Sequence, residues 1–327
     1  MPTSSTRRLL NGSVAAAALA LLLPPTALAQ QGTIKILVGY PAGATSDALT
    51  RVVAEHMSKS LGQTVIVENK AGAGGRLANE VLKSSPPDGS TLVMTPVATI
   101  SIFPHSFAGQ LRYDPFKDFA PVAHLANFHV GFGVGTQVPV KTLKEYVDWV
   151  KADPAKNGFY ASAAAGSIPH FFGVMFAQAA GLRLTHVPYK GTASAMQALV
   201  GGEITAISTV LGDISSLVKG GKARVLAMGG EKRDPAMPDV PTFRELGFNL
   251  EAKPWYGLFA PAGTPAAVVE RLSRAAADAM KDPALRERFV TMGLDPTGLP
   301  ASDLARIMKD DYERWGPVIK ASGFKPE

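Results

Sequence analysis

Two loops of small and hydroxyl-bearing residues hold most of the chemistry that this sequence offers. Residues 40–47 read Tyr-Pro-Ala-Gly-Ala-Thr-Ser-Asp and residues 162–167 read Ser-Ala-Ala-Ala-Gly-Ser, and each run lies between an expected strand and an expected helix. Small residues let a ligand approach the backbone closely, and the unpaired N–H groups at a helix start favour a carboxylate or phosphate. Either loop alone could simply cap its helix, but the two together predict an anion site between them.

Ser167 and His170 are the pair whose residue types suggest catalysis, because a serine beside a histidine can act as a nucleophile with its general base. However, no nucleophile elbow or orienting carboxylate accompanies them, and the sequence contains no Walker loop and no His-Glu-x-x-His motif. We therefore expect no enzymatic activity, and interpret His170 as a ligand contact or a structural hydrogen-bonding residue. Asp47 is interpreted as a helix-start residue rather than a general base. An exported Ser/His hydrolase is the alternative from a different functional class.

Neither a metal nor an organic cofactor is expected. The chain has no cysteine, and none of its six histidines has another at i+3 or i+4, so no local metal-binding pattern is present. Gly72-x-Gly74 follows a strand as in dinucleotide sites, but Leu77 occupies the place of the third glycine. The formal net charge of +6 is scattered along the chain. It predicts no nucleic-acid partner, although a mild positive field would attract an anionic ligand.

The elements that must position these loops alternate along the chain. Short apolar runs typical of strands are separated by segments with helical spacing, which indicates an α/β fold with mostly parallel sheets and helices on their faces. Thr142, Thr264 and Asp282 are expected to mark helix starts. The final expected strand should return to the first sheet, and the C-terminal part should be helical. The expected strands are residues 33–38, 64–67, 91–94, 130–134, 158–161, 184–187, 204–209, 224–228 and 255–260.

The first 29 residues are interpreted as a secretory signal and not as part of the fold. Arg7 and Arg8 precede an apolar run from Val14 to Leu23, and Ala-Leu-Ala at residues 27–29 forms a small-x-small cleavage site. The apolar run is shorter than the roughly 20 residues that cross a bilayer. We expect cleavage near Ala29, export to the periplasm by either the general or the twin-arginine route, and no stable membrane insertion of the mature chain.

Several segments resemble the Bug family, the receptors associated with tripartite tricarboxylate transporters. Residues 67–75 (VENKAGAGG) are similar to the family's VENRPGAGG segment, and the likeness continues through residues 87–92 (PDGSTL), 187–191 (VPYKG) and 261–265 (PAGTP). Matches occur in order from about residue 34 to residue 319. The combination covers nearly the whole chain after the expected signal.

The resemblance implies a type II periplasmic-binding-protein-like fold, with two lobes that each contain a mostly parallel sheet flanked by helices, joined by two crossover segments. We expect lobe 1 at residues 30–124 plus 254–327 and lobe 2 at residues 125–253. The implied function is extracytoplasmic capture of a small organic carboxylate by hinge closure, followed by delivery to membrane transporter subunits or to a sensor kinase. A monomer is expected. A receptor for a neutral solute or another anion is the alternative within the binding class.

In the family, the first strand–helix loop and a Ser-x-Gly-x-Gly-Ser-x-x-His loop hold the carboxylate. This sequence departs from that pattern, because Ala44 and Ala164 stand where glycine is usual and Thr205 stands where aspartate is usual. The extra methyl groups narrow the pocket, which favours an aliphatic or aromatic carboxylate over an amino acid. The expected ligand-binding residues are Tyr40, Ala42, Gly43, Ala44, Thr45, Asp47, Thr95, Ser162, Ala165, Gly166, Ser167, His170 and Tyr189.

Overall fold

The computed structural model describes residues 32–326. The expected signal sequence and its cleavage site near Ala29 lie outside these residues. Within them, the helices are all too short or too polar to cross a membrane.

The first sheet has six strands in the order β11-β4-β10-β3-β1-β2. β1 pairs in parallel with β2 and β3, whereas β10 runs antiparallel to both of its neighbours, β3 and β4, and β11 runs antiparallel to β4. The sheet is therefore mixed, with most strands sharing one direction. The strands are β1 (Ile34–Val38), β2 (Val65–Asn69), β3 (Thr91–Pro96), β4 (Phe119–Phe128), β10 (Trp255–Pro261) and β11 (Leu294–Pro300).

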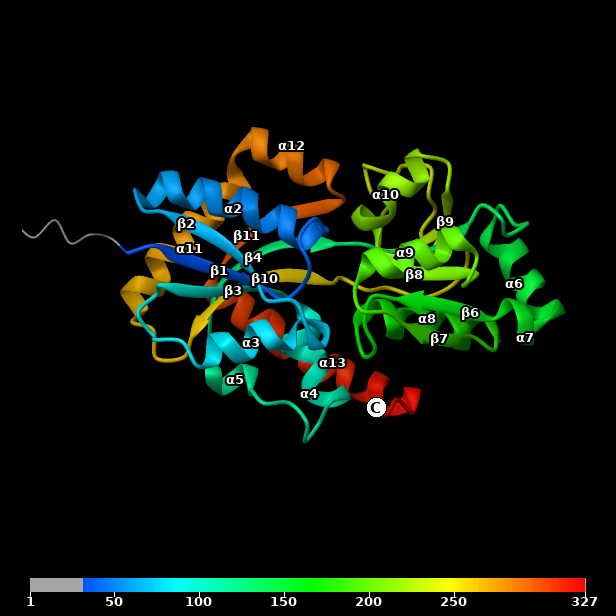
Figure 1. Ribbon diagram of the computed structural model, residues 1–327, viewed down its shortest axis with the longest axis horizontal. Helices are drawn as coiled ribbons and strands as arrows, with labels where there is room; N and C mark the ends of the chain where they lie inside the picture. The colour runs from blue at the N-terminus through cyan, green and yellow to red at the C-terminus, as the bar shows by residue number, and fades with distance from the viewer. Residues whose placement is uncertain (1–31, 327) are drawn as a thin grey trace, which may run out of the picture. The chain divides into compact units, whose positions relative to one another are not determined.

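The second sheet has five strands in the order β7-β6-β8-β5-β9. β6 pairs in parallel with β7 and β8, and β5 runs antiparallel to β8 and β9. Figure 1 shows this sheet in green, built from the middle of the chain, while the first sheet combines blue and cyan strands with yellow and orange ones. The strands are β5 (Val130–Gly135), β6 (Phe159–Ser162), β7 (Thr185–Pro188), β8 (Ala206–Val210) and β9 (Ala223–Gly229).

Helices follow most of the parallel strands and cover the sheets. In the first lobe, α2 packs against β2 and α11, and both α11 and α13 pack against β4. The helices of this lobe are α2 (Thr45–Leu61), α3 (Arg76–Lys83), α4 (Phe103–Ser106), α5 (Pro115–Asp118), α11 (Ala266–Lys281), α12 (Pro283–Thr291) and α13 (Ala301–Ser322), with short turns η1 (Ala73–Gly75) and η2 (Ala98–Ile102). Those of the second lobe are α6 (Leu143–Ala152), α7 (Pro154–Asn157), α8 (Ile168–Ala180), α9 (Thr192–Gly201) and α10 (Leu211–Lys219).

The chain passes between the sheets twice. The first passage is at His129, the single residue between β4 and β5, and the second is the long segment 230–254 between β9 and β10. β10 returns to the first sheet as the sequence predicts, between β3 and β4. β4 continues in the first sheet as far as Phe128, beyond the expected boundary at residue 124. The division of the chain into lobes at residues 124/125 and 253/254 stays a prediction.

Local capping signals explain where several helices begin. The Thr142 hydroxyl accepts a hydrogen bond from the Glu145 N–H (3.2 Å), and the Asp282 carboxylate accepts from the first turn of α12, so both predicted caps are confirmed. Thr264 lies one residue too early, because Pro265 occupies the N-cap position of α11. The Thr142 and Asp282 side chains thus accept hydrogen bonds from N–H groups that a helix start otherwise leaves unpaired.

Candidate functional site

Two adjoining cavities are each lined by residues from both lobes. The larger, of about 720 Å³, is lined by residues 39–41 and 71–76 from one lobe and by residues 163–165 and 188–191 from the other. The smaller, of about 60 Å³, lies beside it and shares Tyr40, Ala163 and Ala164. The larger volume is within the range of about 300–1,000 Å³ that is usual for small-molecule sites.

The expected ligand-binding residues divide into three groups by position. Tyr40, Ala165, His170 and Tyr189 line the larger cavity, and Tyr40, Ala44 and Ser167 line the smaller one. The others line neither cavity. Contact of any of these residues with a ligand stays a prediction. The expected ligand-binding residues that line neither cavity are Ala42, Gly43, Thr45, Asp47, Thr95, Ser162 and Gly166.

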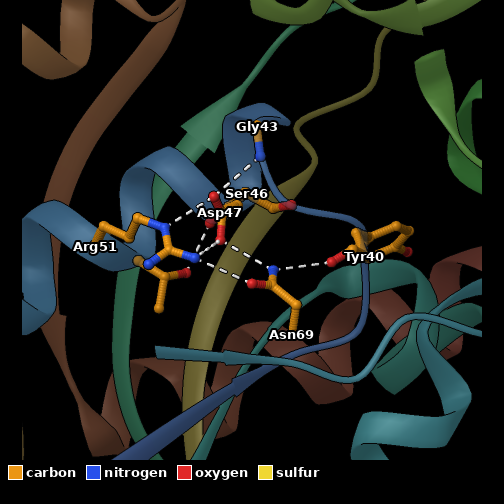
Figure 2. A network of polar contacts seen from close by, with 7 residues as sticks. Tyr40, Gly43, Ser46, Asp47, Arg51 and Asn69 are labelled. Carbon is orange, nitrogen blue, oxygen red and sulfur yellow. Dashed lines mark hydrogen bonds and ion pairs between the residues drawn. The ribbon is translucent and has the colours of Figure 1, made fainter. Parts of the chain in front are cut away.

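Asp47 fixes the first loop from behind. Its carboxylate accepts hydrogen bonds from the Gly43 N–H (3.0 Å) and the Asn69 side-chain amide (2.9 Å) and forms an ion pair with Arg51 (3.0 Å), as Figure 2 shows. Asn69 also donates to the Tyr40 carbonyl (3.0 Å). Partial burial acts to raise the pKa of Asp47, but the bonds from Arg51, Gly43 and Asn69 outweigh it and lower that pKa. The ionised carboxylate therefore shapes the loop that carries Tyr40.

Tyr40 stands at the junction of the two cavities. Its hydroxyl donates to the Gly74 carbonyl (3.1 Å), which ties the first loop to the turn before α3. Burial, together with the nearby negative charge of Asp213, raises the pKa of Tyr40 well above its usual range. The phenol is therefore neutral at physiological pH, with an oxygen that can still accept a hydrogen bond.

The second loop folds back on itself before α8. The Ser167 hydroxyl donates to the Ala164 carbonyl (2.7 Å) and accepts, at 3.4 Å, from the His170 N–H, which makes Ser167 the N-cap of α8. Gly166 adopts a left-handed backbone conformation with φ of 74°, which few residues other than glycine adopt readily. The serine hydroxyl is thus used for capping and is not directed at His170 as a nucleophile would be.

His170 is held in one tautomer. The Gly166 N–H donates to Nδ1 of His170 (3.0 Å), so Nδ1 must be the acceptor and Nε2 carries the proton. The ring lines the larger cavity and stacks on His186 with the ring centroids 3.9 Å apart. Burial lowers the pKa of His170 to about 4, and burial together with His170 lowers the pKa of His186 to about 3. At neutral pH both rings are uncharged.

Asp213 joins the two lobes beside the smaller cavity. Its carboxylate accepts from the Thr45 N–H (2.9 Å) and hydroxyl (2.5 Å) in α2 and from the Thr192 hydroxyl (3.1 Å) in α9. Burial raises the pKa of Asp213, and the bonds from Thr45 and Thr192 act in the opposite direction. The N–H at the start of α2, which the sequence assigns to the ligand, is therefore already occupied by a carboxylate of the chain itself.

Among residues 32–326, the charged residues around the larger cavity are all cationic. Arg76, Lys190 and Lys325 line it, and no aspartate or glutamate of this range does so. Sequence reasoning missed these cations and also missed Asp213. Asp213 follows an expected strand end, where ligand-site residues of open α/β sheets gather, and that position could have identified it. Arg76 directly follows the Gly-rich turn at residues 72–75. We compared that turn only with dinucleotide-binding loops and did not consider the arginine after it.

Two mixed sheets flanked by helices, with a cavity between their lobes, define the fold of type II periplasmic binding proteins. Residues 49–324 match the family described as the tripartite tricarboxylate transporter family receptor. The chain belongs to this family.

The chain is similar to several relatives and solved structures. It is 34% identical over 294 residues to the "UPF0065 protein in gbd 5'region" of Cupriavidus necator, covering 90% of this chain and 88% of the relative. The solved structure of the periplasmic binding protein BugD is 29% identical with a TM-score of 0.84, covering 91% of this chain and 99% of BugD. MatC from Rhodopseudomonas palustris with bound malate is 32% identical with a TM-score of 0.80, covering 88% and 98% of the two chains.

These findings confirm the expected fold and its resemblance to the Bug family. The chain is an extracytoplasmic solute-binding receptor rather than an enzyme, because the family consists of such receptors.

Proposed function

We propose that this receptor captures a small carboxylate in the larger cavity between its lobes. The observation that carries the proposal is that a cavity of about 720 Å³ is lined, among residues 32–326, by three cations and no acidic side chain, with the neutral His170 among its lining residues. Such a wall attracts an anion by its field and offers it directed donors. The malate in the similar structure of MatC is a ligand of the same class.

The carboxylate would be held mainly by the second loop. His170 offers its Nε2–H, and the N–H groups of Ala165 and Ser167 form no hydrogen bond within residues 32–326. These donors lie at the start of α8, where the helix dipole also favours negative charge. The first loop would contribute no donor to the carboxylate from these groups, since Asp213 occupies the start of α2 and the Tyr40 hydroxyl already donates to Gly74.

Capture would involve closure of the lobes about the two passages at His129 and residues 230–254. The bonds from Thr45 to Asp213 then act as a contact of the closed state, because they join α2 of one lobe to α10 of the other. The closed receptor would deliver its ligand to membrane subunits of a tripartite tricarboxylate-type transporter or to a sensor kinase. We further propose that it is a periplasmic monomer, exported with cleavage near Ala29.

The test is a ligand screen on the exported protein after unfolding and refolding to remove any carried-over solute. Mono-, di- and tricarboxylates, aromatic acids, amino acids and neutral vitamins are added one at a time, and the thermal unfolding midpoint is measured. One class of carboxylate is expected to raise the midpoint by up to several degrees. A ligand at 100 times its dissociation constant adds about 2.7 kcal/mol to the free energy of unfolding. Small-angle scattering with that acid should then show a smaller radius of gyration.

Two results would contradict the proposal. Stabilisation by a neutral solute but by no acid would show that the cationic cavity does not select anions. Stabilisation by an acid that is unchanged in His170→Leu would show that this acid binds elsewhere. Preference for aspartate or citrate over apolar acids would leave a carboxylate receptor in place but refute the expectation drawn from Ala44 and Ala164.

A further inference from the structure

Arg76 owes its position to the turn that precedes it. Residues 72–75 adopt left-handed or otherwise positive φ values in succession, with Ala73 the single non-glycine residue of this kind among residues 32–326. The Ala73 carbonyl accepts a hydrogen bond from Nε of Arg76 (2.8 Å). The turn therefore fixes the direction of the guanidinium group at the start of α3, on the wall of the larger cavity.

Two aromatic rings also pack near the guanidinium group of Arg76. Its central carbon lies 4.0 Å from the centroid of the Phe107 ring and 5.9 Å from that of Phe103. Stacking on an aromatic face is a usual way to hold arginine in place without a counter-charge. Arg76 forms no ion pair with any carboxylate of the described residues, and its side chain is half-buried.

These restraints leave one part of the group unused. Nε is bonded to Ala73 and one face is against Phe107, whereas neither Nη1 nor Nη2 has a partner among residues 32–326. The two Nη groups can donate in parallel to a planar anionic group. A half-buried cation with two free donors, at the edge of a cavity that no acidic side chain of residues 32–326 lines, is suited to a ligand rather than to a structural ion pair.

We propose that Arg76 is a specificity-determining residue that binds a second acidic group of the ligand, so that the receptor selects dianions over monoanions. This inference rests on the proposed function, because it assumes that a first carboxylate is held at the second loop. The ligand would then span from His170 in one lobe to Arg76 in the other, with the aromatic rings of Phe107 and Phe324 beside it. Binding both ends would also couple ligand length to the separation of the lobes.

Lys190 and Lys325 cannot replace Arg76 in this role. Both are exposed, and neither is restrained by an aromatic face or a backbone hydrogen bond in the described residues. Their charges attract any anion without selecting one, and dissolved salt screens this attraction. A contact role for Arg76 and a general field from all three cations therefore predict different patterns of binding.

The experiment compares straight-chain α,ω-dicarboxylates of four to eight carbons with their monomethyl esters, which keep the length but lose one charge. Isothermal titration calorimetry is carried out on the refolded exported protein and on Arg76→Gln, Arg76→Lys and Lys325→Gln. The wild type should bind one diacid more tightly than its ester. Arg76→Gln should weaken diacid binding by about 30-fold, the loss expected for charge-assisted hydrogen bonds, and ester binding by less than about 3-fold.

The conservative and control variants separate a directed contact from a general field. Arg76→Lys should still lose about 10-fold for the diacid, since an ammonium group cannot reproduce the two parallel donors. Lys325→Gln should change binding of both ligands by less than about 3-fold. Equal losses in Arg76→Gln and Lys325→Gln, or equal losses for diacid and ester, would overturn the role of Arg76.

Failure of this inference can be told from failure of the proposed function. If the wild type binds monocarboxylates or esters as tightly as diacids and Arg76→Gln alters neither, the inference is wrong and the carboxylate receptor stands. If the wild type binds none of the acids or esters in the panel, both the receptor proposal and the role of Arg76 are overturned.

Discussion

The Gly166→Ala variant is expected to bind the ligand at least 10-fold more weakly than the wild type. A Cβ at this position would lie 2.8 Å from the ring of Phe107 and 3.2 Å from the Ser106 hydroxyl, both in the other lobe. The Phe107 ring has little room to move, because it is buried and packs against Phe103 with centroids 5.0 Å apart and beneath Arg76. The loop or the lobe must therefore shift. Loss of one charge-assisted hydrogen bond through such a shift costs about 1.5–3 kcal/mol, which is about 10-fold or more in affinity.

Gly181→Ala is the matched control for this prediction. Gly181 ends the same helix, α8, and also has a positive φ, of 62°, but an added Cβ there would meet nothing within 4 Å. Both variants should lose about 1–2 kcal/mol of unfolding free energy to backbone strain, measured by urea denaturation. Calorimetry with the acid identified in the screen should show weakened binding in Gly166→Ala alone. Equal affinities in the two variants would mean that the approach of Gly166 to Phe107 has no part in binding.

The His170→Gln variant is expected to lose part of the acid sensitivity of the wild type. Burial lowers the pKa of His170 to about 4, whereas a histidine in the unfolded chain titrates near 6.5. Between these values the unfolded chain takes up a proton that the folded protein does not, so the free energy of unfolding falls as the pH falls. For His170 alone the loss from neutral pH to pH 4 is about 3 kcal/mol.

Glutamine suits this test because its side-chain carbonyl can accept the Gly166 N–H bond and its amide does not titrate. Urea denaturation at pH 7, 5.5 and 4.5 should give similar stabilities for both proteins at pH 7 and a flatter profile for the variant. His186 and His124 should keep the rest of the histidine dependence, since burial lowers their pKa values to about 3 and about 4. Parallel profiles would refute the assignment of a buried neutral His170. Asp47 affects stability only at lower pH. Because its pKa is lowered in the folded protein, its contribution to the free energy of unfolding is lost as the pH falls below the usual value of 3.8.

The sequence predicts the parts of this fold whose signals are local. Strand β10 is a continuous apolar run and β1 is apolar except at Lys35, and the caps at Thr142 and Asp282 depend on residues within four positions. β4 and β11 escape prediction because prolines interrupt them, Pro121 in β4 and two further prolines in β11. β11 is an edge strand, where proline costs little, so its pattern resembles a loop.

The candidate site is predictable only in outline. Small residues and strand ends identify both loops, which do form walls of the two cavities. The role of Thr45 could not be read from its neighbours, because its partner Asp213 is 168 positions away in the sequence and reaches it from the other lobe. Arg76 depends on three separate segments, the turn at Ala73, the ring of Phe107 and the cavity. Such side-chain environments exist only after the lobes have assembled.

The most direct test of the central claim is a crystal structure of the protein with the acid identified by the screen. We predict electron density for the acid in the larger cavity, with one carboxylate within hydrogen-bonding distance of Nε2 of His170. Density for the acid elsewhere, for example in the cavity beside the lobe passages that His129, Arg233 and Lys253 line, with the space at His170 holding only water, would contradict the account.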